Sequence, residues 1–231
     1  MDGRRRERLW RLLSERAPGG SGWAGVVVAL VVAELGVEGA AITVRTASRV
    51  QDLAAASDDW TAALEELQYT VGEGPGVEAF ETGGPVLVED LRADHDRWPG
   101  LTDSALPSGV AAAFAFPMQA GAIRLGTLSL YRRQTGELSA DELADALVLA
   151  DLATTALLTD SSGAEPASAE AHEGYYDDVN VATGMLATEL RVSLEDALLR
   201  LRAHAFSNHL PLTEVARAIV LRQLRLDAPP D

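Results

Sequence analysis

The stretch from Val179 to Leu226 constrains the fold most, because it holds three helix-forming segments and leaves almost no residues for loops. In each segment, apolar residues recur at spacings of three and four, which places them on one face of a helix. Ser193 is a good N-cap with Asp196 three residues later, and Pro211 suits the first turn of the third helix. The pattern predicts a three-helix bundle, whose small core needs support from an upstream helix or a second copy of the chain. The three apolar sets are Val179, Ala182, Leu186 and Leu190; Leu194, Ala197, Leu198, Leu201 and Ala205; and Leu212, Val215, Ala216, Ile219, Val220 and Leu224.

Upstream of this stretch, the hydrophobic pattern switches between the period of helices and that of strands. Asp58 or Asp59 is placed to cap a helix, and Ser139 with Glu142 has the spacing of a capping box. Because the last two strands are consecutive and closely joined, we expect an α+β fold, in which an antiparallel sheet with helices on one side precedes an all-α three-helix domain. The predicted helices cover residues 4–16, 22–35, 58–67, 77–82 and 139–158. The predicted strands cover residues 39–46, 50–56, 85–88, 110–118 and 124–131.

Charge is distributed unevenly along the chain. The net charge of −16 argues against a protein that is coated by nucleic acid. Residues 175–226, however, balance six acidic residues against six arginines, so the acidity lies upstream. The chain contains no cysteine, which excludes disulfides and thiolate metal sites and makes the cytoplasm the natural location.

One segment imitates a targeting signal, since three arginines at 4–6 precede an apolar run from Trp23 to Ala33. That run of eleven residues is too short to span a bilayer. Glu7, Glu15 and the break at 18–20 also fit a signal peptide poorly. We therefore expect a buried helix from Gly22 to Leu35 and no association with a membrane.

Catalytic motifs do not emerge from the sequence. The glycine-rich turn Gly72–Gly76 lacks the Lys-Ser/Thr pair of a nucleotide-binding P-loop. Asp94, His95 and Asp96 are drawn easily as a metal site, but adjacent loop residues rarely converge on one ion, so solvated charges are the preferred interpretation. We expect a protein that is not an enzyme and has no catalytic residue, no metal site and no cofactor.

Residues 20–158 carry a series of motifs in a fixed order. These are Leu67-Gln68-Tyr69 before Gly72-Glu73-Gly74-Pro75, Asp90-Leu91 with Arg97-Trp98-Pro99, Gly109-Val110 leading to Phe116-Pro117, and the run from Leu125 to Tyr131. In this order they resemble the GAF domain, a sensor of small molecules and signals. The resemblance implies an unidentified small-molecule ligand or signalling protein as partner. Many relatives carry a cysteine where this chain has Gly76, so sensing through a thiol there does not apply.

Three aromatic residues of these motifs, Tyr69, Trp98 and Phe116, are the candidates for a ligand pocket on the sheet. The alternative for Tyr69 and Trp98 is that both are loop anchors that cover the core. Aromatic residues at joints between loops and sheets are common, which favours this alternative.

The C-terminal stretch carries a second set of motifs. They are Ala182-Thr183-Gly184-Met185-Leu186, Ser193 to Leu198, Leu201 to Phe206, and Leu212 to Ala216. In this register they resemble the ANTAR domain, an RNA-binding module of transcription antitermination regulators. The resemblance implies binding of paired stem-loops in a nascent mRNA leader, and two hairpins imply two such domains and hence a homodimer. Val181 and Thr183 stand where the family usually has Gln and frequently has Lys.

The candidate RNA-binding residues follow from this resemblance and from helix geometry. Five of them match positions of the family motif: Ala182, Thr183, Gly184, Arg202 and Ala205. Phe206 and His209 share a helix face with Arg202, and an aromatic ring between cations suits the unstacked bases of an RNA loop. The alternative is that Phe206 and Met185 complete the core and that Arg202 is a solvated charge.

We therefore divide the chain into an N-terminal helix (1–19), a GAF sensor domain (20–159), a linker (160–174), an ANTAR domain (175–226) and a tail (227–231). The expected function is that of a cytoplasmic, signal-responsive transcription antitermination regulator. The alternative is a ligand-binding or protein-interaction module whose helical C-terminal domain serves only dimerisation. A weaker third hypothesis is DNA binding by a helix-turn-helix, since the joint at Asn208–Leu210 permits that geometry.

Overall fold

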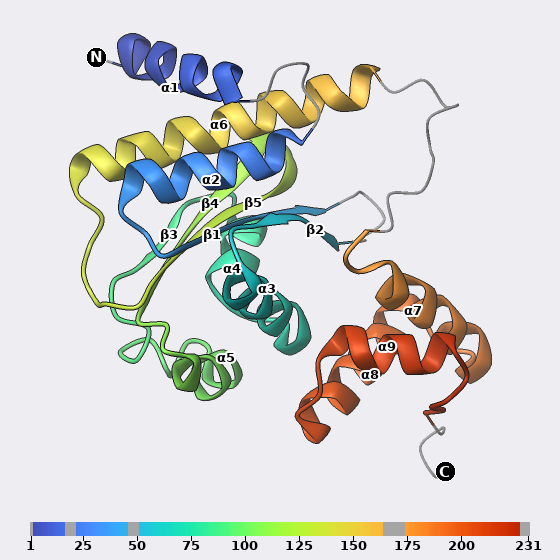
Figure 1. Cartoon of the computed structure of the whole chain (residues 1–231). Helices are drawn as coiled ribbons and strands as arrows, with labels where there is room; N and C mark the ends of the chain where they lie inside the picture. The colour runs from blue at the N-terminus through green and yellow to red at the C-terminus, as the bar shows by residue number, and fades with distance from the viewer. Residues whose placement is uncertain (1, 17–21, 46–50, 164–173, 227–231) are drawn as a thin grey trace.

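A computed structural model describes residues 2–16, 22–45, 51–163 and 174–226, and shows a sheet between helices with a separate helical bundle (Figure 1). The strands are β1 (Gly39–Arg45), β2 (Gln51–Ala56), β3 (Val86–Val88), β4 (Ala112–Ala120) and β5 (Ile123–Arg132). The helices are α1 (Asp2–Arg16), α2 (Trp23–Leu35), α3 (Asp59–Val71), α4 (Pro75–Thr82), α5 (Pro99–Ala105), α6 (Ala140–Gly163), α7 (Asp177–Leu190), α8 (Leu194–Asn208) and α9 (Leu212–Val220). Most of the predicted linker and the whole predicted tail lie outside the described residues.

The five strands form one antiparallel sheet in the order β2-β1-β5-β4-β3. This arrangement confirms the predicted α+β class. At the centre, β4 and β5 pair along their full lengths and are joined by a tight turn at Gly121, whose φ of 61° suits glycine. The ladder places the polar side chains of Thr127, Ser129 and Tyr131 on one face of the sheet and Leu128 and Leu130 on the other.

The prediction of helices on one side of the sheet is wrong, because helices cover both faces (Figure 1). One face packs its alternate residues, among them Phe114 and Phe116, against α2 and α6, and α1 covers these two helices from outside (Figure 1). The other face, with Ala113, Ala115 and Tyr131, lies under α3, α4 and α5. The central strands are buried almost without interruption, as expected for a sheet covered twice. Alanine and polar side chains on the second face concealed this from the hydrophobic pattern.

The predicted helix start signals are confirmed where their geometry is described. Asp58 caps α3 by accepting a hydrogen bond of 2.8 Å from the Thr61 N–H. Ser139 and Glu142 form the reciprocal capping box of α6, at 3.2 Å and 2.6 Å. Helix α3 runs to Val71 rather than to the predicted Leu67, because Gly72, which has a left-handed conformation, is the residue that ends it. Pro211 is the N-cap of α9, one residue before the first turn.

The apolar helix α2 is buried, as predicted, between the sheet, α1 and α6. Leu9 and Leu13 of α1 pack into the same core. Among the residues that the structure describes, no helix is long and apolar enough to cross a membrane.

The predicted three-helix bundle is formed by α7, α8 and α9. Its core contains nearly all of the predicted apolar residues, but Leu194 is 61% exposed because it is the first residue of α8, beside the Ser193 cap. The support that the small bundle needs comes from the same chain. Ala41, Leu53 and Tyr69 of the sheet domain belong to the same buried cluster as the bundle core. The bundle is thus packed against β1, β2 and α3.

Candidate functional site

The joint between the sheet domain and the bundle is built around three side chains that contact one another in series, Tyr176, Tyr69 and Arg202. The rings of Tyr69, on α3, and Tyr176, just before α7, lie 4.6 Å apart and are 2% and 0% exposed. The guanidinium carbon of Arg202, on α8, lies 4.8 Å from the centroid of the Tyr69 ring. A cation over an aromatic face is attracted by the ring quadrupole, and more strongly where water is excluded. The predicted RNA-binding residue Arg202 therefore contacts the sheet domain.

Glu66 fastens the start of α9 to α3. Its carboxylate accepts hydrogen bonds from the Thr213 N–H at 2.9 Å and from the Thr213 hydroxyl at 2.6 Å. The Tyr175 hydroxyl donates to the other carboxylate oxygen at 3.4 Å. Hydrogen bonds to a carboxylate are stronger than neutral ones, and Glu66 is buried, so this contact orients the bundle on the sheet domain.

A buried polar network lies directly behind this joint. Glu65 accepts hydrogen bonds from Thr43 (2.8 Å) and from the Tyr131 hydroxyl (2.6 Å). Gln68 donates to the same Tyr131 hydroxyl at 2.6 Å and accepts from the Gly76 N–H at 2.9 Å. Burial raises the pKa of Tyr131, and the adjacent carboxylate of Glu65 raises it further. The network links α3, the glycine-rich turn and two strands.

The three predicted pocket residues are not brought together. Tyr69 belongs to the cluster shared with the bundle, Trp98 belongs to the cluster between the sheet and α3, α4 and α5, and Phe116 lies on the opposite face of the sheet. All three side chains are buried. The three aromatic residues therefore belong to three separate packing clusters and do not form the walls of one pocket.

The predicted RNA-binding residues are divided between the bundle core and its surface. Ala182 and Ala205 are fully buried, and Thr183 is buried with its hydroxyl donating to the Val179 carbonyl at 2.6 Å. In this conformation these three side chains shape the helix packing and do not reach a ligand directly. Phe206 is 46% exposed, so it does not complete the core. With the exposed His209, it lines a hollow of about 640 Å³ between α8 and α3.

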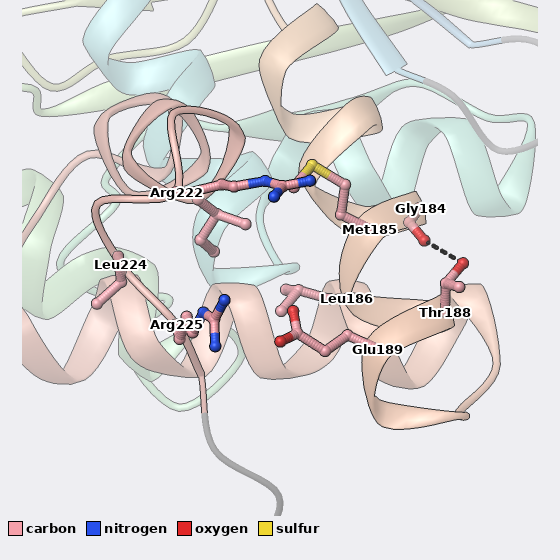
Figure 2. Close-up of a pocket in the computed structure, with 9 residues that line it drawn as sticks. Gly184, Met185, Leu186, Thr188, Glu189, Arg222, Leu224 and Arg225 are labelled. Carbon is pink, nitrogen blue, oxygen red and sulfur yellow. Dashed lines mark hydrogen bonds between the residues drawn. The ribbon is translucent and has the colours of Figure 1, made fainter.

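Gly184 lies on a separate hollow of about 510 Å³ on the outer side of the bundle (Figure 2). Met185, Thr188 and Glu189 of α7 form one wall, and Arg222 and Arg225, after α9, come from the other side. A Cβ added at Gly184 would meet nothing within 4 Å, so the backbone there is open to a ligand. Two arginines beside an exposed backbone can bind an anionic chain such as a sugar-phosphate backbone.

Several of these residues were not predicted from the sequence. Glu66 and Tyr176 act through contacts that are distant in sequence, for which no local motif exists. Arg222 and Arg225 had a usable signal, because the end of the chain is rich in arginine. His95, by contrast, bonds to the Thr102 hydroxyl at 2.8 Å, and the described residues contain no group of three side chains suited to holding a metal ion.

The comparisons with known proteins identify the sheet domain. The sequence pattern of the GAF domain family matches residues 25–158, more than half of the chain. The chain belongs to the GAF domain family. GAF domains are sensing modules for small molecules or signals. The match ends before α7, so it does not extend to the bundle.

Solved structures show the same fold at low sequence identity. The GAF domain of an Acinetobacter phosphoenolpyruvate-protein phosphotransferase is 12% identical with a TM-score of 0.54, over 70% of this chain and 96% of that one. The GAF domain of the Coxiella burnetii phosphoenolpyruvate-protein phosphotransferase is 15% identical with a TM-score of 0.52, over 68% and 95%. No curated protein sequence matches the chain.

Proposed function

We propose that this GAF protein is a cytoplasmic, signal-responsive RNA-binding regulator of transcription antitermination, in which α7–α9 form an ANTAR domain that binds RNA stem-loops. In this proposal the chain acts by binding and carries no catalytic site. The observation that supports it best is the position of Arg202. This arginine matches the RNA-binding motif and at the same time stacks on Tyr69 of the GAF domain. A signal that alters the GAF domain therefore has a direct route to the RNA-binding face.

The surface of the bundle supports RNA as the partner. Gly184 presents open backbone beside Arg222 and Arg225, which suits phosphate contacts (Figure 2). Phe206 presents an exposed ring, which suits stacking with an unpaired base. The buried motif residues Ala182, Thr183 and Ala205 contribute by allowing the helices to pack closely. Because the bundle is electrically neutral, we expect modest affinity that falls steeply with salt.

The test is a gel-shift titration of the full chain with RNA that contains two short hairpins, at low and moderate salt. Arg225→Gln and Arg202→Gln are each expected to weaken binding by about 1–3 kcal/mol. Arg217→Gln is the matched control, since Arg217 is an exposed arginine of α9 outside the hollow. Absence of salt-dependent binding to hairpin RNA would rule the proposal out, and preference for duplex DNA would favour a helix-turn-helix.

A second candidate function is dimerisation alone, with ligand or protein binding at the GAF domain. Exposed apolar side chains on the bundle favour it, notably Leu199 at 64% exposure and Leu221 at 57%. For this function, Leu199→Asp shifts the chain to monomers in sedimentation equilibrium, and the wild-type chain binds no hairpin RNA. RNA binding by the wild type decides against dimerisation as the sole role.

A further inference from the structure

A hollow of about 620 Å³ lies at the joint between the GAF domain and α8, apart from the Gly184 hollow. The GAF domain contributes Arg45 at the end of β1 and Arg124 on β5, and the bundle contributes Arg202 on α8. Each guanidinium lies against an aromatic ring: Arg45 is 4.6 Å from the centroid of Phe80, and Arg124 is 5.9 Å from it. Three cations from two domains thus border one space.

These arginines have few anionic partners. In the described part of the chain, none of the three forms an ion pair with a carboxylate, although Glu81 and Glu195 also line the hollow. Arg124 donates to the backbone carbonyls of Phe80 and Glu81. The Nε of Arg202 is buried and has no hydrogen-bond partner among the described residues. Buried donors without partners are uncommon in folded proteins, and a bound ion is one of the explanations for such a donor.

Burial disfavours the charged form of Arg45 and of Arg202, and so lowers the pKa of both. Burial lowers the pKa of Arg45, and the nearby carboxylates of Glu65 and Glu81 offset this only in part. Burial also lowers the pKa of Arg202, and repulsion from Arg45 adds to that effect. Two cations that repel each other across a partly dry space are stabilised by an anion placed between them.

From this geometry we infer a binding site for a small-molecule oxyanion, with a phosphate or carboxylate head group held between Arg45 and Arg202. The planar fork of arginine matches both head groups. Phe80 and Val77 provide an apolar wall for the rest of the ligand.

Such a ligand favours the conformation in which the bundle packs on the GAF domain, which we call the docked conformation. Only that conformation holds both arginines around one space. The site therefore deepens the proposed function by assigning the chemistry of the signal. An anion that occupies Arg202 competes with RNA for the same side chain. The binding site itself does not depend on RNA binding, so the two claims fail separately.

The first experiment is calorimetric titration of the full chain with pyrophosphate, and in a second arm with citrate, at constant ionic strength. We expect saturable binding of at least one of the two, which also identifies the preferred head group. Arg45→Gln and Arg202→Gln should each weaken it about tenfold, the loss of one charge-assisted contact. The control Arg217→Gln should leave it unchanged. No saturable binding of either probe, or an equal loss in the control, would overturn the inference.

A measurement on the wild-type chain covers the case in which a variant fails to fold. Phenylglyoxal modifies accessible arginines, and mass spectrometry locates the modified positions. The bound probe should protect Arg45 and Arg202 several-fold and leave Arg217 equally reactive. Unchanged reactivity at Arg45 and Arg202 under saturating probe would contradict the site. In the gel shift, pyrophosphate or citrate should weaken hairpin binding; a chain that binds the probe but never binds RNA retains the site and loses the proposed function.

Discussion

The two faces of the GAF sheet differ in chemistry. The face covered by α2 and α6 is apolar, with Phe114, Phe116 and Leu128 fully buried or nearly so. The face toward α3 and the bundle carries a hydrogen-bonded network around Glu65 and Tyr131. Apolar packing is non-directional and chiefly stabilises a fold, whereas polar contacts fix one arrangement and respond to charge. The comparison indicates that one face mainly stabilises the domain, whereas the other, under the proposed function, is the face that would transmit a signal to α7–α9.

The largest expected effect on stability comes from a cavity in the apolar core between α2 and the sheet. Leu30→Ala should lower the free energy of unfolding by about 2–5 kcal/mol, because Leu30 on α2 is fully buried in the core that α2 forms with the sheet and α6. Urea denaturation followed by circular dichroism measures the change. At temperatures where the variant is folded, its affinity for hairpin RNA should equal that of the wild type. A selective loss of RNA affinity would show that the apolar face also transmits.

A substitution that weakens the contact between the GAF domain and the bundle should lower stability less, and it should change the affinity for RNA. Glu66→Gln weakens the bonds to Thr213 and should cost about 1–3 kcal/mol of docking free energy. With Arg202 released from Tyr69, hairpin RNA should bind several-fold more tightly in a gel shift. Glu89→Gln is the control, an exposed glutamate of the same domain. Weaker RNA binding by Glu66→Gln would mean that docking assists rather than restrains the RNA-binding face.

Because the ring of Phe206 is partly exposed, its removal should change RNA affinity more than it changes stability. Phe206→Ala should leave the free energy of unfolding within about 0.5 kcal/mol, because much of the side chain is in solvent. Its affinity for hairpin RNA should fall by about 1 kcal/mol through loss of base stacking. Thermal denaturation and fluorescence anisotropy with labelled RNA give the two numbers. A large loss of stability would assign Phe206 to the joint instead.

The smallest expected change is at Tyr176. Its hydroxyl is buried without a hydrogen-bond partner among the described residues, so Tyr176→Phe should match or exceed wild-type stability by up to about 1 kcal/mol at neutral pH. Burial raises the pKa of Tyr176, so unfolding releases a proton above about pH 10 and stability falls as the pH rises. The variant should lose stability less steeply between pH 10 and 11. Identical slopes in urea titrations would contradict this account.

Sequence patterns predicted those features that depend on neighbouring residues. Helix starts at Asp58, Ser139 and Ser193 rest on contacts three residues apart, and each is present in the structure. The second covered face was missed, because Ala113 and Ala115 give no apolar signal strong enough to predict burial. The joint was missed because Glu66 and Thr213 are 147 residues apart, so their hydrogen bonds follow only from the tertiary arrangement. The same reason explains why Arg45 and Arg202 were never paired from the sequence.

The most direct test of the proposal that the GAF domain restrains RNA binding by the bundle is the distance between α3 and α8 in solution. The chain has no cysteine, so cysteines introduced at the exposed Asp59 and Ala203 carry the only spin labels. Double electron–electron resonance on the free chain should give one narrow distance distribution. Saturating two-hairpin RNA should shift it to longer and broader distances, and pyrophosphate or citrate should restore the narrow one. An unchanged distribution in the RNA-saturated protein would contradict the account.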